Sequence, residues 1–139
     1  MEYLVGVGLA LAVCLLGTFV GLDRDRAFYP TVTIVVASYY ALFAVIGGST
    51  RALAIECLVI TAFLLVSILG FKTNPWLLVA ALFSHGIFDS IHGHIISNPG
   101  VPMWWPMFCL AFDLTAAGYL AWLLSRPRGA RPPSRRPSS

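Results

Sequence analysis

The sequence predicts an all-α integral membrane protein, a polytopic bundle of five transmembrane helices, and two observations predict this class. Hydrophobic residues make up 58% of the 139 residues and charged residues only 11%, and the mean hydropathy is +0.82. A soluble domain is normally about 25% charged. The apolar residues also gather into five segments, each close to the ~20 residues that a helix needs to cross a membrane.

Short polar connections with helix-start and helix-stop signals separate these segments. The first segment has no basic stretch before it and no small-residue cleavage pattern after it, so we expect a retained helix. Pro30 suits the first turn of the second helix, and Ser49 or Thr50 is expected to cap the third. Asn74 and Pro75 are typical of the start of the fourth. The expected helices cover 3–22, 30–47, 52–71, 76–96 and 104–124. Because the loops are short, neighbouring helices are expected to be antiparallel.

The placement of lysine and arginine predicts the orientation in the membrane. With the C-terminus in the cytoplasm, eight of the nine basic residues lie inside and only Arg51 lies outside. The N-terminus is therefore expected outside and the C-terminus inside. Residues 1–124 form the transmembrane domain, followed by an Arg/Pro/Ser-rich cytoplasmic tail at 125–139. This tail cannot bury apolar surface and is expected to be disordered. It either determines topology or contacts anionic headgroups.

The fourth segment carries ionisable residues that are costly inside a membrane, namely His85, Asp89, His92 and His94. A charged group near the bilayer centre costs at least ~2.5 kcal/mol. Spacings of four and three residues place His85, Asp89 and His92 on one helical face. His94 points roughly the opposite way unless the helix frays at Gly93. We expect the shared face to look away from lipid, toward a partner, water or a metal.

Polar residues on other expected helices lie at a similar depth, counted with a rise of about 1.5 Å per residue from the outer ends. Glu56 lies on the third helix and Asp113 on the fifth, and two phenols, Tyr39 and Tyr40, lie on the second. Their convergence in the outer half of the membrane predicts a shared polar pocket that opens toward the extracytoplasmic side.

Histidine and carboxylate side chains suit a divalent metal, Zn²⁺ or non-haem iron. The candidate ligands are His85, Asp89, His92, His94, Glu56 and Asp113, and Glu56 and Asp113 are also candidate catalytic acids or bases. His85 and His92 are separated by about 10 Å along the helix axis. They are therefore not expected to hold one ion alone, and ligands from neighbouring helices must complete the site.

The leading functional hypothesis is a small membrane metalloenzyme that acts on a lipid-soluble or amphipathic substrate, with hydrolysis favoured over oxidation. The candidate substrate-pocket residues are Tyr39, Tyr40, Trp104 and Trp105. The alternatives are an oligomeric proton- or metal-ion-conducting protein, a metal-free acid–base isomerase, and a non-catalytic membrane subunit with a satisfied polar network. The expected partners are membrane lipids, a lipid-soluble small molecule and further copies of this chain, but not nucleic acid.

Several other chemistries are disfavoured. No lysine lies inside an expected span, which excludes a retinal-type Schiff base. All histidines lie on one helix, so one chain cannot bind haem through histidines on two helices. No CxxC pair is present, and Cys14, Cys57 and Cys109 are interpreted as small buried residues. Because Cys57 and Cys109 both fall in the outer half of the membrane, a disulfide or a soft-metal site is the alternative for these two. The sequence DRDR at 23–26 is expected to pair with itself or to contact lipid headgroups.

Three groups of residues resemble a family of small uncharacterised bacterial multi-span membrane proteins. They are DRDRAFYP at 23–30, the set His85, Asp89 and His92, and the series Val101, Pro102, Trp104, Trp105, Pro106, Cys109 and Asp113. The resemblance covers roughly 23–124 and implies a location in the bacterial inner membrane. It implies no particular activity.

Overall fold

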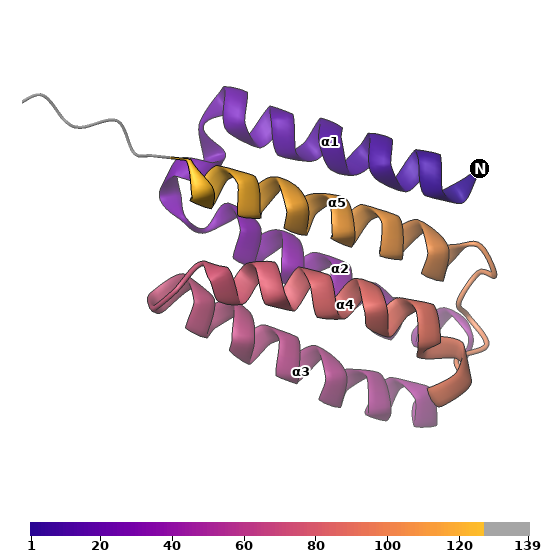
Figure 1. The fold of residues 1–139 in the computed structure, drawn as a ribbon. Helices are drawn as coiled ribbons and strands as arrows, with labels where there is room; N and C mark the ends of the chain where they lie inside the picture. The colour runs from indigo at the N-terminus through magenta and orange to yellow at the C-terminus, as the bar shows by residue number, and fades with distance from the viewer. Residues whose placement is uncertain (127–139) are drawn as a thin grey trace, which may run out of the picture.

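The computed structural model describes residues 1–126, and all regular secondary structure in this part of the chain is helical (Figure 1). Its elements are α1 (Glu2–Val20), the 3₁₀ helix η1 (Leu22–Asp25), α2 (Phe28–Ile46), α3 (Thr50–Lys72), α4 (Trp76–Ile95) and α5 (Trp105–Ser125). The predicted all-α class is confirmed, and each predicted helix corresponds to an observed one. The predicted tail at 125–139 lies almost wholly outside the described residues.

Within the described residues, four helices are long and apolar enough to cross a membrane: α1, α2, α3 and α5. α4 has 20 residues but is less apolar, because from its midpoint onward it carries three histidines and Asp89. Several apolar helices of this length indicate a membrane protein. α4 is the helix that most needs to be enclosed by others.

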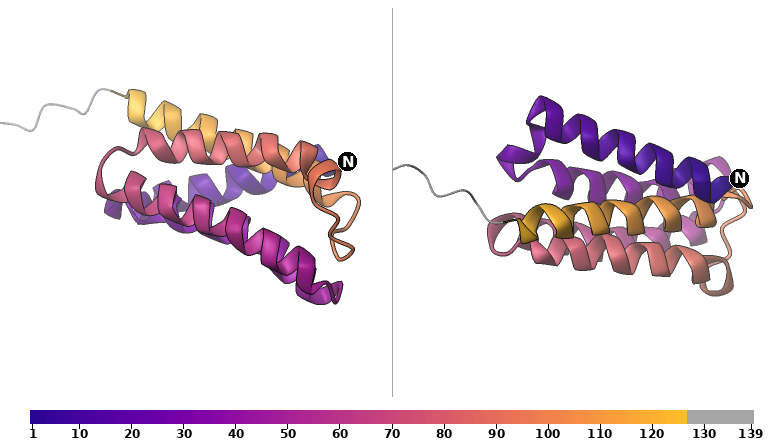
Figure 2. Two further views of the ribbon diagram at one scale, coloured as in Figure 1. Left: turned by 90° about the horizontal axis from the view of Figure 1, so that it is seen from below. Right: turned by 45° about the horizontal axis from the view of Figure 1, so that its top comes forward.

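Three helices flank α4 in the bundle (Figures 1 and 2). α4 packs between α5 and α3 and also touches α2, while α1 packs along the outer side of α5. The N-terminus, the turn at 47–49 and the connection at 96–104 lie at one end of the bundle. The η1 segment, the turn at 73–75 and the end of α5 lie at the other end.

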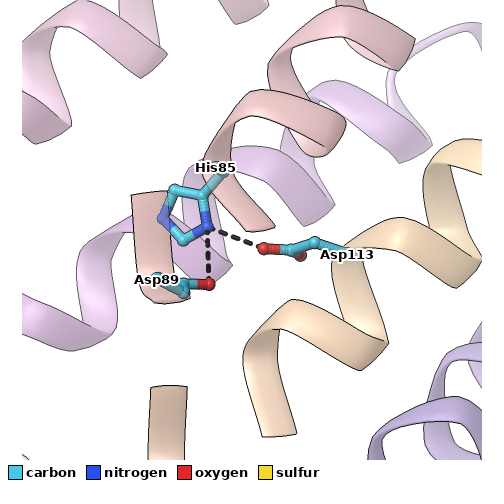
Figure 3. Close-up of side chains that lie close together, drawn as sticks. All are labelled: His85, Asp89 and Asp113. Carbon is cyan, nitrogen blue, oxygen red and sulfur yellow. Dashed lines mark hydrogen bonds and ion pairs between the residues drawn. The ribbon is translucent and has the colours of Figure 1, made fainter. Parts of the chain in front are cut away.

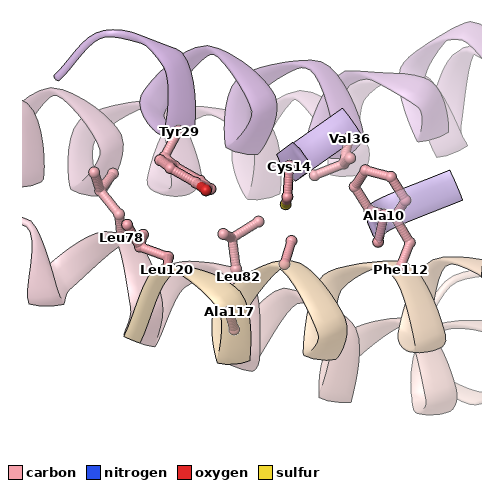
Figure 4. Packing of buried hydrophobic residues seen from close by; sticks show 10 residues of the cluster. Ala10, Cys14, Tyr29, Val36, Leu78, Leu82, Phe112, Ala117 and Leu120 are labelled. Atoms are coloured by element: carbon pink, nitrogen blue, oxygen red, sulfur yellow. The ribbon is translucent and has the colours of Figure 1, made fainter. Parts of the chain in front are cut away.

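The apolar core lies where α1, α2, α4 and α5 meet (Figure 4). Leu82 of α4 and Ala10 of α1 are completely buried there, together with Cys14. Small residues let the backbones approach closely, as is usual between membrane helices. At Gly6, for example, a Cβ would collide with the Phe108 carbonyl of α5. This close approach holds α1 against α5.

The helix ends largely confirm the predicted capping residues. The Ser49 side chain accepts a hydrogen bond from the Ala52 backbone N–H at 3.2 Å. The Asn74 side chain accepts one from the Trp76 N–H at 3.0 Å. The expected self-pairing of the loop at 23–26 is absent from the described part of the chain, because Asp23 instead accepts a hydrogen bond from Thr18 at 2.9 Å.

The connection between α4 and α5 folds back over the α2–α3 turn. Gly100 lies so close to the Phe43 carbonyl and the Gly47 backbone that a side chain would overlap both. The Asn98 amide donates hydrogen bonds to the Tyr40 carbonyl and to the Glu56 carboxylate, each at 3.0 Å. These contacts close the end of the bundle above the polar face of α4.

We expect Gly100→Ala to destabilise the protein by about 1–3 kcal/mol, because the added methyl forces the connection away from the α2–α3 turn. The control is Gly93→Ala, where a Cβ meets nothing within 4 Å and alanine favours the helix. Chemical unfolding of both variants in detergent micelles measures the difference. Equal stability of the two variants would contradict the assigned packing.

Candidate functional site

The polar face of α4 is buried as its spacing predicts. His85, Asp89 and His92 are each at most 1% exposed. His94 is exposed on another side of α4, because the helix continues to Ile95 without fraying at Gly93. His94 is therefore not placed to bind an ion together with the buried candidate ligands.

The innermost polar side chains form a cluster that we call the deep group: His85, Asp89 and Asp113 (Figure 3). His85 Nδ1 lies 2.7 Å from Asp113 Oδ2 of α5 and 3.3 Å from Asp89 Oδ2 of its own helix. One ligand atom from each residue lies within 4.8 Å of the other two. This arrangement can hold a metal ion.

The deep group contains more acceptor oxygens than it has donors. Both Asp89 carboxylate oxygens and Asp113 Oδ1 are buried without a hydrogen-bond partner among the described residues. His85 Nδ1 carries at most one proton, and the shorter distance indicates that this N–H donates its hydrogen bond to Asp113 rather than to Asp89. A buried polar group without a partner costs about 1–3 kcal/mol. A cation in the centre of the deep group would satisfy these oxygens.

His92 and Glu56 form a second cluster, the outer pair, nearer the end of α4. His92 Nε2 lies 2.7 Å from Glu56 Oε1 of α3. The Tyr40 ring stacks on the His92 ring, with centroids 3.9 Å apart and planes inclined by 21°. In the described chain the outer pair is thus satisfied by direct contacts.

The predicted ligand set is therefore divided by the structure. His85, Asp89 and Asp113 come together, whereas Glu56 and His92 pair with each other beyond them. The reason is the helical rise, which separates His85 from His92 by about 10 Å. Asn98 is a member of the site that the sequence analysis missed, because its contacts depend on how the connection folds back.

Two of the four predicted substrate-pocket residues line a groove, and two do not. Tyr39 and Trp105 pack edge to face, with ring centroids 5.0 Å apart, in the wall of this groove. Tyr40 is buried against His92 instead, and Trp104 is half-exposed beside Trp105. The two tyrosines separate because consecutive residues project from different sides of a helix.

This groove, the lateral groove, has a volume of about 430 Å³ and lies between α1 and α2 above α5. Its lining is almost entirely apolar and includes Leu9, Val35 and Phe112. Cys109 lies in its floor, one helical turn from Asp113. The floor of the lateral groove is therefore formed by the same helix that carries Asp113 of the deep group.

A second hollow, the outer cavity, has a volume of about 290 Å³ and is lined by residues of α4 and of the α4–α5 connection. His92 and Asn98 are among its lining residues. None of the three cavities found among residues 1–126 is lined by His85, Asp89 or Asp113. The deep group is thus enclosed, with the outer pair between it and the outer cavity.

No family model, curated protein or solved structure matches this chain. The residues of the site themselves therefore carry the functional argument.

We expect Glu56→Leu to destabilise the protein by about 1–3 kcal/mol, because His92 and the Asn98 amide lose their acceptor. Glu56→Gln keeps an oxygen at that place and should retain most of the stability. Unfolding of both variants in the same detergent tests this. A similar loss in the two variants would show that the charge, rather than the acceptor, stabilises the outer pair.

Proposed function

We propose that this chain is a small integral-membrane metalloenzyme with a divalent cation, Zn²⁺ or iron, bound by His85, Asp89 and Asp113. The observation that carries the proposal is the deep group itself, in which three ligating side chains converge and three carboxylate oxygens lack partners. An apolar core of the same volume would be at least as stable as this cluster. The cluster therefore has no evident purpose as a structural element alone.

The donor set fits a catalytic metal site. One imidazole and two carboxylates match the ligands that zinc and non-haem iron accept. Three protein ligands leave a further coordination position for water or substrate, and a bound ion would lower the pKa of such a water and polarise a substrate carbonyl. Hydrolysis is therefore favoured over oxidation. Asp89 has the freest oxygens of the three ligands, which suits it to accept a proton from the water as well.

The lateral groove supports a lipid-soluble or amphipathic substrate. Its walls are apolar, it opens between two helices whose surfaces are suited to lipid, and its floor at Cys109 approaches the deep group. A substrate with an apolar chain would enter from within the membrane, and a small movement of α5 around Cys109 would bring its polar end to the ion. Tyr39 and Trp105 lie at the groove wall as apolar contacts for that chain.

The proposed orientation has all five α-helices crossing the membrane, the N-terminus outside and the C-terminus inside. Arg24, Arg26 and Lys72 lie at one end of the bundle, and Arg51 lies at the end that carries the outer cavity. This asymmetry supports placing the outer cavity on the extracytoplasmic side. The proposed location in a bacterial inner membrane rests on the sequence resemblance alone.

A second function, ion or proton conduction by an oligomer of this chain, is favoured by one observation. Ionisable side chains follow one face of α4 in steps of four and three residues, from the deep group to the outer cavity. Such a series inside a membrane is typical of an ion pathway. A conducting protein would need further ionisable side chains between His85 and the inner end of α4. A neighbouring copy of the chain would have to supply them.

We expect purified chain to contain one zinc or iron ion per molecule, measured by elemental analysis. Asp89→Ala and Asp113→Ala should lose most of it, because each removes a ligand from a three-ligand site. His94→Ala is the matched control, since His94 is exposed on the same helix, and should keep it. Folded, metal-free wild-type protein that also fails to bind added Zn²⁺ or Fe²⁺ would refute the metalloenzyme proposal and favour conduction.

We expect a photoactivatable fatty acid in the membrane to label residues of the lateral groove. Val35→Trp should reduce this labelling several-fold, because Val35 lines the groove and the indole fills it. Leu42→Trp is the control on the same helix, where Leu42 is similarly exposed but lies outside the groove. Mass-spectrometric mapping gives the readout, and equal labelling in both variants would argue against an entry route there.

A further inference from the structure

We propose that the outer pair, His92 and Glu56, is a transient cation-binding site through which the deep group exchanges its ion with the extracytoplasmic side. In this proposal the Asn98 side chain closes the transient site. The inference rests on the proposed metal site and adds the route and direction of loading. It assigns His92, Glu56 and Asn98 to ion passage rather than to the deep group.

The outer cavity brings water and ions to the first residue of the route. His92 lines this cavity and is nevertheless almost completely buried, so it lies at the base of the hollow. Its Nε2 contacts Glu56 Oε1 at 2.7 Å. An imidazole nitrogen and a carboxylate at such a distance are two ligand atoms suited to the same cation. Two ligands hold an ion weakly, as a point of passage requires.

The next donors inward follow at short intervals along α4. Asp89 lies three residues before His92, and His85 lies four residues before Asp89, which corresponds to axial steps of about 4.5 and 6 Å. Both Asp89 oxygens are buried without hydrogen-bond partners. Asp89 can therefore receive a cation from the outer pair without breaking an existing hydrogen bond, and it already belongs to the deep group.

The other approaches to the deep group lack a series of polar ligands. Toward the inner end of α4, the buried residues after the deep group are Leu82, Ala81 and Leu78. The lateral groove is apolar and opens toward lipid. Moving a bare ion through such surroundings is prohibitively costly. Among the described residues, only the side of His92 and Glu56 offers a continuous series of ligands.

Asn98 blocks this series in the described conformation. Its amide donates to Glu56 Oε1 and to the Tyr40 carbonyl, each at 3.0 Å, so it occupies the same oxygen that contacts His92. Its own side-chain oxygen accepts a weak hydrogen bond from the Gly100 N–H at 3.3 Å. A cation entering from the outer cavity must displace the Asn98 amide from Glu56.

The test measures rates of metal exchange in the full chain. Apo protein in lipid nanodiscs is mixed with Zn²⁺, and uptake is followed by stopped-flow competition with a zinc-sensitive dye. Loaded protein is then mixed with a chelator to follow release. The variants are His92→Gln, Glu56→Gln and Asn98→Ala, with His94→Gln as the matched control on the exposed side of α4. Gel filtration and circular dichroism confirm that each variant is folded.

We expect His92→Gln and Glu56→Gln to bind one ion per chain and to load it about tenfold more slowly, because the attractive ligands at the cavity base are lost. Asn98→Ala should accelerate both uptake and release, which a variant that merely misfolds would not do while keeping one ion. His94→Gln should behave as the wild type.

Two outcomes would overturn the inference while leaving the metal site intact. One is unchanged exchange rates in all three variants. The other is loss of the ion from His92→Gln as complete as that from Asp89→Ala, which would make His92 a ligand of the deep site. Wild-type chain that binds no zinc would refute the proposed site and this route together.

Discussion

The ionisable face of α4 is costly to expose to an apolar environment, and the arrangement of the other helices depends on keeping it buried. Each charged residue at the membrane centre costs at least ~2.5 kcal/mol, while the net stability of a folded domain is only about 5–15 kcal/mol. Exposing Asp89 and any charged histidine of this face to lipid would therefore remove a large part of that stability. Accordingly α2, α3 and α5 all contact α4, and the connection after α4 covers its end.

The polar atoms of this face are hydrogen-bonded near one end of α4 but only partly hydrogen-bonded further in. Near the outer end, Glu56, His92 and Asn98 form direct hydrogen bonds, so this part stabilises the closure of the bundle. Further in, two carboxylates share one imidazole nitrogen and keep unpaired oxygens. Helix packing alone would not favour the second arrangement, because buried acceptors without donors are destabilising. The contrast between neighbouring clusters on one helix distinguishes the outer pair, whose polar atoms contact one another, from the deep group, whose unpartnered oxygens make it the candidate site for a resident ion.

The sequence was sufficient to predict the helices and the buried face. The lengths of the apolar segments predict the helices, and the spacing of the ionisable residues predicts the face that they share. His85, Asp89 and His92 share a face as their spacing requires, and Asp113 reaches His85 from the depth expected for it. The partners of each group were not predictable. Glu56 pairs with His92 rather than with the deep group, and Asn98 reaches it through a fold of the connection that rests on Gly100. Such contacts depend on helix rotation and loop path, which local pattern does not encode.

The two hollows beside the site differ in polarity, and this difference bears on how an enclosed metal centre could work in a membrane. An ion and a lipid-like substrate cannot share one entrance, because a surface that solvates one repels the other. Here the apolar lateral groove approaches the deep group through Cys109 of α5, whereas the outer cavity approaches it through His92 of α4. The proposed ion and the proposed substrate would therefore reach the same three residues from separate directions. The contact between α4 and α5, where His85 meets Asp113, would be the point at which they meet.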